Sequence, residues 1–397
     1  MIVLVCACGD NRAAPDARPD VPGIDAFTYP AFAPPIPQVR KGIGHVMPAV
    51  RVVPIFYPGD AMRTDMVSGL GKLQTAQQWS LIAGEYGVGP FTLGTPIDLT
   101  TAAPTAITDD QIRLLLASGL DGTHPEWGPT DAATIESTIY TIYFPTTTTV
   151  TGPGTSCVNF AAYHNTATQT QGHMIYAVMP RCGPLSGHTA VDTLFAITTH
   201  ELYEAATDPH LDAYTIIGSE YYAWPLAMGG IEVGDMCAFL GDNYFTDPEV
   251  GYLTQRIWSN HAASAFHDPC LPIPSGQGPY FAAVPETPDL VTLAFGGGQT
   301  LTMDGVNIPL LGRKTIKVRL ASEAPLADWT VAAIRMGRGG ASPLAFQLDR
   351  TSGHNGDTLL LTITALSQPA SKVQPFALIS TLDGRNTIWA GVVGITP

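Results

Sequence analysis

The sequence contains few charged side chains, and positive ones are the scarcest. Only 13% of its 397 residues are charged, and 19 Lys and Arg stand against 34 Asp and Glu, for a formal net charge of −15. Phosphate binding needs clustered basic side chains, so we expect no nucleic-acid partner. No apolar run approaches the roughly 20 residues of a membrane-spanning helix, so we expect membrane contact only through a lipid anchor.

Two further absences narrow the chemistry. The sequence has no C-x-x-C pair, which argues against a zinc knuckle, and no G-x-S-x-G element, which argues against an α/β-hydrolase serine. Two of the six cysteines, Cys6 and Cys8, lie at the extreme N-terminus. The other four lie in the middle of the chain, at Cys157, Cys182, Cys237 and Cys270.

Those four central cysteines predict two disulfides and an oxidising compartment. Cys157 and Cys182 lie at the same end of two strands, residues 158–164 and 174–179, that we expect to pair antiparallel, so a bond between them is geometrically reasonable. Cys237 would then pair with Cys270. Four cysteines allow three pairings, and the other two stay open at this point.

The N-terminus is typical of export. Residues 1–8 resemble the end of a bacterial lipoprotein signal, with Val5, Ala7 and Cys8 at the positions of a lipobox. The basic region and most of the apolar region that precede a lipobox are missing, which suggests a start codon further upstream. We therefore expect an exported protein that is lipid-anchored at Cys8 or secreted. The alternative is an apolar start without a targeting role.

Composition and residue pattern divide the chain into two domains and two linkers. Residues 9–45 are rich in Pro, Ala and Asp and predict an extended linker. Residues 46–272 mix strands with helices, expected at 62–86, from 109 onward and at 189–207. Residues 273–282 form a second linker. Residues 283–397 contain seven short, β-branched segments separated by turn residues, which predict an all-β sandwich of the immunoglobulin or fibronectin kind.

The most informative stretch runs from residue 200 to 209 and reads H-E-L-Y-E-A-A-T-D-P. His200 and Glu204 are four residues apart, so on a helix they lie on one face. Glu201 lies beside them. This is the pattern of the H-E-x-x-H zinc helix with a glutamate in place of the second histidine.

A catalytic zinc needs three protein ligands and one open position. His200 and Glu204 would supply two ligands, and Glu201 would act as general base. His210 lies at the metzincin offset for the third ligand, although Thr207 replaces the glycine of that pattern. Asp235 is the alternative, because it precedes Cys237 and a disulfide would hold it. The many carboxylates also permit Ca²⁺.

The same residues are also compatible with a purely structural role, without a metal or catalysis. H-E-x-x-E occurs by chance on amphipathic helices, with His200 as a hydrogen-bonded core histidine and both glutamates solvated. His164, His173 and His188 precede the motif without metal-ligand spacing. Each of these three is typical of a surface or hydrogen-bonded histidine.

Several blocks together resemble the EXORDIUM-like, phosphate-induced protein family and its bacterial relatives. The blocks are residues 200–209, 212–214 and 232–237, with residues 50–57 and 157–164 as flanking elements. The resemblance covers about residues 45–272. It implies a zincin-like metallopeptidase in bacterial members and a secreted cell-wall protein in plant members. Position 210 varies in that family, which favours Asp235, but both candidates stay open.

The sequence therefore predicts an α/β zincin-like domain (α+β) followed by a β-sandwich accessory domain. The expected function is zinc-dependent hydrolysis of a peptide or protein substrate. The alternative is a non-catalytic cell-surface binding or structural module, with the motif structural or calcium-binding.

Overall fold

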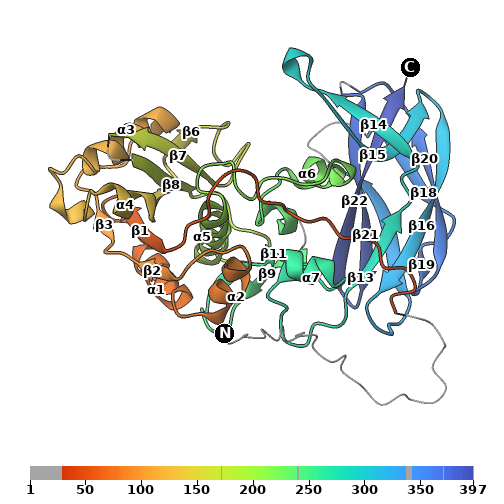
Figure 1. The fold of residues 1–397 in the computed structure, drawn as a ribbon, viewed down its shortest axis with the longest axis horizontal. Helices are drawn as coiled ribbons and strands as arrows, with labels where there is room; N and C mark the ends of the chain where they lie inside the picture. Colours follow the sequence, from red (N-terminus) through yellow and green to blue (C-terminus); the bar gives the residue numbers. More distant parts are fainter. Residues whose placement is uncertain (1–28, 171, 239–240, 337–341, 370, 397) are drawn as a thin grey trace, which may run out of the picture.

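The computed structural model describes residues 29–170, 172–238, 241–336, 342–369 and 371–396. The expected lipoprotein signal, with Cys8, and the first part of the expected linker lie outside these ranges. In the part of the chain described, no helix is both long and apolar enough to cross a membrane. Figure 1 shows two parts, with a mixed region of helices and strands on the left and a β-sandwich in blue on the right.

The first part is built around one sheet in the order β2-β1-β5-β8-β7, with β3 also paired to β1. All its pairs are parallel except that of the edge strand β7 with β8. The strands are β1 (Val50–Phe56), β2 (Phe91–Leu93), β3 (Ile97–Asp98), β5 (Thr138–Phe144), β7 (Tyr163–Gln169) and β8 (Gly172–Pro180).

Helices cover both faces of this sheet, because alternate strand residues point to opposite sides. Ile175 and Ala177 face the cluster that includes α1, α2 and α5, whereas Tyr176 and Val178 face α3 and α4. The helices are α1 (Arg63–Leu73), α2 (Gln77–Glu85), α3 (Asp109–Gly119), α4 (Ala132–Glu136) and α5 (Ala190–Thr207). The result is a layer of helices on each side of a buried sheet.

Short elements complete the first part between α5 and the sandwich. The helices among them are α6 (Ala223–Met228), α7 (Asn260–Ser264) and the 3₁₀ turns η2 (Ser219–Tyr221), η3 (Asp235–Cys237) and η4 (Gly241–Asn243). The strands are β9 (Tyr244–Thr246), β10 (Leu253–Gln255), β11 (Ile257–Trp258) and β12 (Cys270–Leu271). Away from them, β4 (Ala106–Thr108) pairs with β6 (Thr149–Thr151), and η1 spans Pro125–Trp127.

The C-terminal part is a β-sandwich, as the sequence predicts. A sheet in the order β13-β16-β20-β18 packs on a second sheet in the order β14-β15-β22-β21-β17-β19. Their strands are β13 (Phe281–Pro285), β14 (Asp289–Ala294), β15 (Thr300–Pro309), β16 (Arg313–Ser322), β17 (Trp329–Arg335), β18 (Leu344–Leu348), β19 (Ser352–Gly353), β20 (Thr358–Ala365), β21 (Val373–Leu382) and β22 (Arg385–Thr396), with the turn η5 at Gly296–Gly298.

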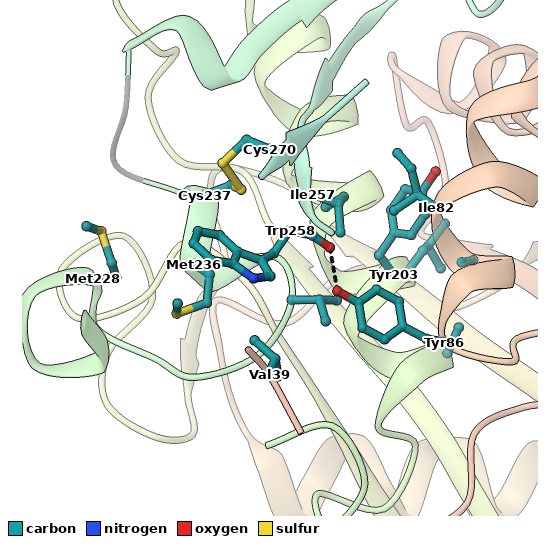
Figure 2. Close-up of a cluster of buried hydrophobic side chains, with 14 of the residues drawn as sticks. Val39, Ile82, Tyr86, Tyr203, Met228, Met236, Cys237, Ile257, Trp258 and Cys270 are labelled. Carbon is teal, nitrogen blue, oxygen red and sulfur yellow. Dashed lines mark hydrogen bonds between the residues drawn. A yellow bond between two sulfur atoms is a disulfide. The ribbon is translucent and has the colours of Figure 1, made fainter. Parts of the chain in front are cut away.

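Both disulfides are those favoured by the sequence. Cys157 pairs with Cys182 and Cys237 with Cys270, with Cα–Cα distances of 5.1 and 5.9 Å. Figure 2 shows the second bond beside Trp258, whose carbonyl accepts a hydrogen bond from the Tyr86 hydroxyl at 2.6 Å. The bond therefore lies within the buried core, and Cys237 is two residues from Asp235.

Three expectations about local structure are wrong. The helix expected over 62–86 is two helices, broken where Ala76 adopts an extended conformation. The strand expected at 158–164 begins only at Tyr163. The polar run expected to separate the two strands, residues 165–172, instead supplies most of β7, up to Gln169, because polar side chains are tolerated on a half-exposed edge strand.

Residues 29–45, which we call the N-terminal strap, also differ from the expected linker. The strap runs from the sandwich across to β1, in red in Figure 1. Ala31 donates its N–H to Asn355 in the sandwich, and Val39 donates its N–H to Asn260 in the first part. Ile36 and Val39 are 3% and 0% exposed, so two apolar side chains in a proline-rich segment are enough to anchor it to the core.

The two parts share one continuous core. Trp224 of α6 packs edge-on against Trp258 and against Trp389 of β22, with ring centroids 5.5 and 5.6 Å apart. The same cluster of buried residues extends from β1 to β22. The parts are therefore packed together through an apolar interface.

Candidate metal centre

Helix α5 supplies most of the site. Thr189 caps its N-terminus by accepting a hydrogen bond from the Asp192 N–H at 3.0 Å. The helix ends at Asp208, whose side chain accepts the N–H groups of Asp212 and Ala213, and Pro209 follows. These caps set the length of the helix, so that its last two turns carry His200, Glu201 and Glu204 beneath the sheet.

His200 and Glu204 face one another, as their spacing predicts. His200 Nε2 lies 3.1 Å from Glu204 Oε2 and 3.9 Å from Asp235 Oδ1. The other ring nitrogen of His200 lies 3.1 Å from Gln255 Oε1. The imidazole of His200 and the carboxyls of Glu204 and Asp235 therefore converge, with atoms close enough to share one metal ion.

The loop before η3 is shaped around this group. The Asp235 N–H donates to Glu204 Oε1 at 2.9 Å, and Gln255 donates to the Gly234 carbonyl at 2.7 Å. A Cβ at position 234 would lie 2.8 Å from both Glu204 Oε1 and His200 Nδ1. Only glycine lets the backbone approach the two side chains this closely.

His210 does not join them. Its Nδ1 lies 3.3 Å from the Thr166 hydroxyl, and its ring packs against His173 at 5.1 Å. Among the described residues, none of the groups of potential ligand atoms includes His210. The chain turns after Pro209, so His210 is carried away from the face of α5 that bears His200 and Glu204. Of the two third-ligand candidates, the structure brings Asp235 to His200 and Glu204.

The sequence reading missed His164, which lies on β7. It pairs with Ala177 of β8, so both side chains point to the face that α5 covers. His164 Nδ1 lies 3.4 Å from Glu201 Oε2 and 3.9 Å from Glu204 Oε2. The signal that could have found it is its place in the flanking block at 157–164.

Asp208 and Glu232 lie on the other side of His164. Its Nε2 is 3.3 Å from Glu232 Oε1. His164, Asp208 and Glu232 form a second group of potential ligand atoms. The sequence offers Asp208 and Glu232 only among the many carboxylates that permit Ca²⁺.

The cluster is rich in negative charge and well buried. Five carboxyl groups face only two imidazoles across the groups described above. Glu201, Glu204 and Asp208 are 4%, 3% and 0% exposed. In the described part of the chain, the ion pairs of Glu201, Glu204, Glu232 and Asp235 are all with these two histidines. A divalent cation would compensate this excess.

The pKa values reflect the same crowding. Burial raises the pKa of Asp208 and of Asp235 to about 6, and it raises the pKa of Glu204 well above its ordinary value. Burial opposes the charged form of His200, but Glu204 and its neighbours outweigh it and raise the pKa of His200 to about 10. Burial would also raise the pKa of Glu232, yet the His164 imidazole lowers it overall.

An open cavity reaches this cluster from the surface. It has a volume of about 420 Å³, and its lining includes His200, Glu201, Asp235 and Gln255. Residues 159–162, just before β7, also line it. The motif is therefore accessible to a molecule in solution, although most of its ligand atoms are buried.

Comparisons with known proteins add little to this geometry. No protein-family model matches the sequence, and no curated protein matches it. Among solved structures, the titin M3 domain matches at 8% identity over 30% of this chain and 97% of that one, with a TM-score of 0.18. A titin M10–obscurin-like 1 immunoglobulin complex matches at 14% identity over 31% of this chain and 96% of that one, also at 0.18. We therefore rest the sandwich assignment on the strand pairing.

Proposed function

We propose that this protein is an exported, zinc-dependent hydrolase of peptide bonds, with a zincin-like first domain. His200, Glu204 and Asp235 would hold the metal. The observation that carries the proposal is the convergence of His200 Nε2 on Glu204 Oε2 and Asp235 Oδ1 beside an open cavity. One imidazole and two carboxylates are a donor set that zinc accepts.

When bound, zinc would polarise the scissile carbonyl and lower the pKa of the attacking water toward about 7. The general base would be Glu201, which lines the cavity. Its Oε2 lies 3.4 Å from His164 Nδ1. Its carboxylate would take the proton from the water and later deliver it to the leaving amine. His164 is a positioning residue, because it contacts Glu201 and does not line the cavity.

The edge strand β7 supports a peptide as the substrate. It lies at the end of the sheet order, and residues 159–162, which immediately precede it, line the cavity. An extended peptide can pair with the free edge of a sheet through its backbone. This arrangement would direct a substrate strand past Glu201.

The two disulfides support export, since such bonds persist in oxidising compartments. We also propose that the chain is lipid-anchored at Cys8 and that it is related to EXORDIUM-like proteins. The sandwich, of immunoglobulin or fibronectin kind, would be accessory. The rival function is a surface binding module with calcium, or no ion, at the motif.

The test measures zinc content and hydrolysis of a mixture of fluorogenic peptides. We expect at least one zinc per chain, one ion fewer in Asp235→Asn, and hydrolysis that zinc removal abolishes. Glu201→Gln keeps an acceptor for His164, so it should retain zinc while hydrolysis falls by about 10²- to 10⁴-fold. Hydrolysis that survives Glu201→Gln would reject the mechanism, and calcium in place of zinc would favour the rival.

A further inference from the structure

A second set of ligand atoms lies on the inner side of His164, away from the cavity. It consists of His164 Nε2, a carboxyl oxygen of Asp208 and a carboxyl oxygen of Glu232. The three side chains come from β7, from the C-terminal end of α5 and from the loop before η3. None of them belongs to the His200, Glu204 and Asp235 group.

Among the described residues these atoms accept or donate no well-formed hydrogen bond, although His164 Nε2 and Glu232 Oε1 form an ion pair at 3.3 Å. The set comprises His164 Nε2, Asp208 Oδ2 and Glu232 Oε1. His164 is 7% exposed and Asp208 is 0% exposed, so water does not replace the missing partners freely. Leaving a buried polar group without a hydrogen bond is unfavourable, and more so when it is charged, so three such atoms in one place favour a bound cation.

The remaining polar atoms of two of these side chains are already engaged. His164 Nδ1 lies 3.4 Å from Glu201 Oε2, and Asp208 Oδ1 accepts two backbone N–H groups. These contacts turn Nε2 and Oδ2 toward Glu232. An imidazole that contacts a carboxylate through one nitrogen and leaves the other free is the usual arrangement of a metal-ligating histidine.

The spacing also suits a metal. His164 Nε2 and Glu232 Oε1 are 3.3 Å apart, which is an ion-pair distance, yet the angles do not make a hydrogen bond. Two ligands bound tetrahedrally to zinc at about 2.0–2.2 Å lie roughly 3.3–3.6 Å apart. The pair therefore has the separation of two ligands of one ion.

We propose that His164, Asp208 and Glu232 bind a second divalent cation of the first-row transition class, such as Zn²⁺ or Mn²⁺. One nitrogen and two carboxylate oxygens favour such ions over Ca²⁺, which prefers oxygen alone. The ion would join β7, the end of α5 and the loop before η3. Its role is structural, since these atoms are enclosed, and the site does not depend on the proposed hydrolysis.

The experiment counts metal ions in the full chain after chelation and reloading with zinc, and separately with manganese. We expect two ions per wild-type chain and one in Glu232→Gln, which keeps the size of the side chain. Asp235→Asn should also retain one ion, and the double variant none. Glu126→Gln, which removes an exposed carboxylate far from the cluster, is the matched control and should keep two.

The outcomes separate the two sites. Two ions in Glu232→Gln, or a single wild-type ion that Asp235→Asn removes, would overturn the second site, and His164 would then be only a charged partner for its carboxylates. A single wild-type ion that Glu232→Gln removes would support the second site and count against the proposed catalytic one. If Glu232→Gln fails to fold, anomalous scattering from zinc-loaded wild-type crystals decides, with a peak expected among the three ligand atoms.

Discussion

The two parts of the molecule differ most in what they bury. In the first part, the buried side chains include His164, Glu201, Glu204 and Asp208. In the described residues of the sandwich, the buried polar side chains are the uncharged Ser322, Asn355, Ser380 and Thr387. Burying charge is costly and persists where a ligand or reaction needs it, so the contrast supports placing the proposed site around α5.

The largest expected effect is a loss of stability from a substitution in the sandwich core that leaves metal binding unchanged. Trp329 is 1% exposed in the sandwich core, and Trp329→Ala should lower the free energy of unfolding by about 3–5 kcal/mol. Zinc content of the folded protein should not change, because Trp329 is remote from the ligands. Urea denaturation followed by metal analysis measures both. Leu360→Ala, at a position 44% exposed, should cost about 0.5 kcal/mol or less, and a comparable loss there would undermine the assignment of the core.

The two disulfides allow a finer comparison within the first part. Replacing either pair by serines should cost about 2–5 kcal/mol. Removing Cys237–Cys270 should also weaken zinc binding, since Asp235 lies two residues away. Removing Cys157–Cys182 should instead raise KM for peptides, because residues 159–162 line the cavity. Thermal denaturation, zinc titration and kinetics on both double variants would show whether these effects separate or coincide.

A single added methyl group should then disturb metal binding without replacing any of the proposed ligands. Gly234→Ala places a Cβ 2.8 Å from Glu204 Oε1 and His200 Nδ1, so zinc affinity should fall by about 10- to 100-fold. Gly84→Ala is the matched control, because a Cβ there meets nothing within 4 Å. Equal zinc affinity in Gly234→Ala and the wild type, by competition with a zinc indicator, would contradict the geometry of the first site.

The smallest expected effect is the pH dependence that arises from two carboxyl groups of the cluster in the first part. The folded pKa values of Asp208 and Asp235 are about 6, above the ordinary value of 3.8. A raised carboxyl pKa stabilises the fold below about pH 4, and that contribution is lost as pH rises through about 6. The Tm of metal-free protein should therefore fall between pH 4 and 7. Zinc should reduce the fall, and identical profiles with and without zinc would contradict it.

Local patterns in the sequence were sufficient for much of the fold. The extent of α5, the main sandwich strands and the favoured disulfide pairing follow from short-range patterns. The convergence of His200 with Glu204 follows from helical periodicity alone. These are the features that neighbours in the sequence determine.

What could not be predicted depends on contacts between distant segments. His164 joins the cluster because its strand pairs with β8 and α5 covers that face, and neither fact is local. Asp235 rather than His210 approaches His200 because the loop carrying Gly234 folds back on the helix. The strap packs because Ile36 and Val39 find an apolar surface that its own composition does not reveal.

The strap also determines how mechanical tension would enter the molecule. Its backbone is bonded to Asn355 in the sandwich at residue 31, and only later to Tyr221, Asn260 and Ile216 of the first part, at residues 35, 39 and 40. A pull transmitted from the N-terminal side therefore loads the sandwich before it reaches β1. If the chain is tethered at that end, the dry β-sandwich bears the strain and the ligand cluster around α5 is sheltered from it.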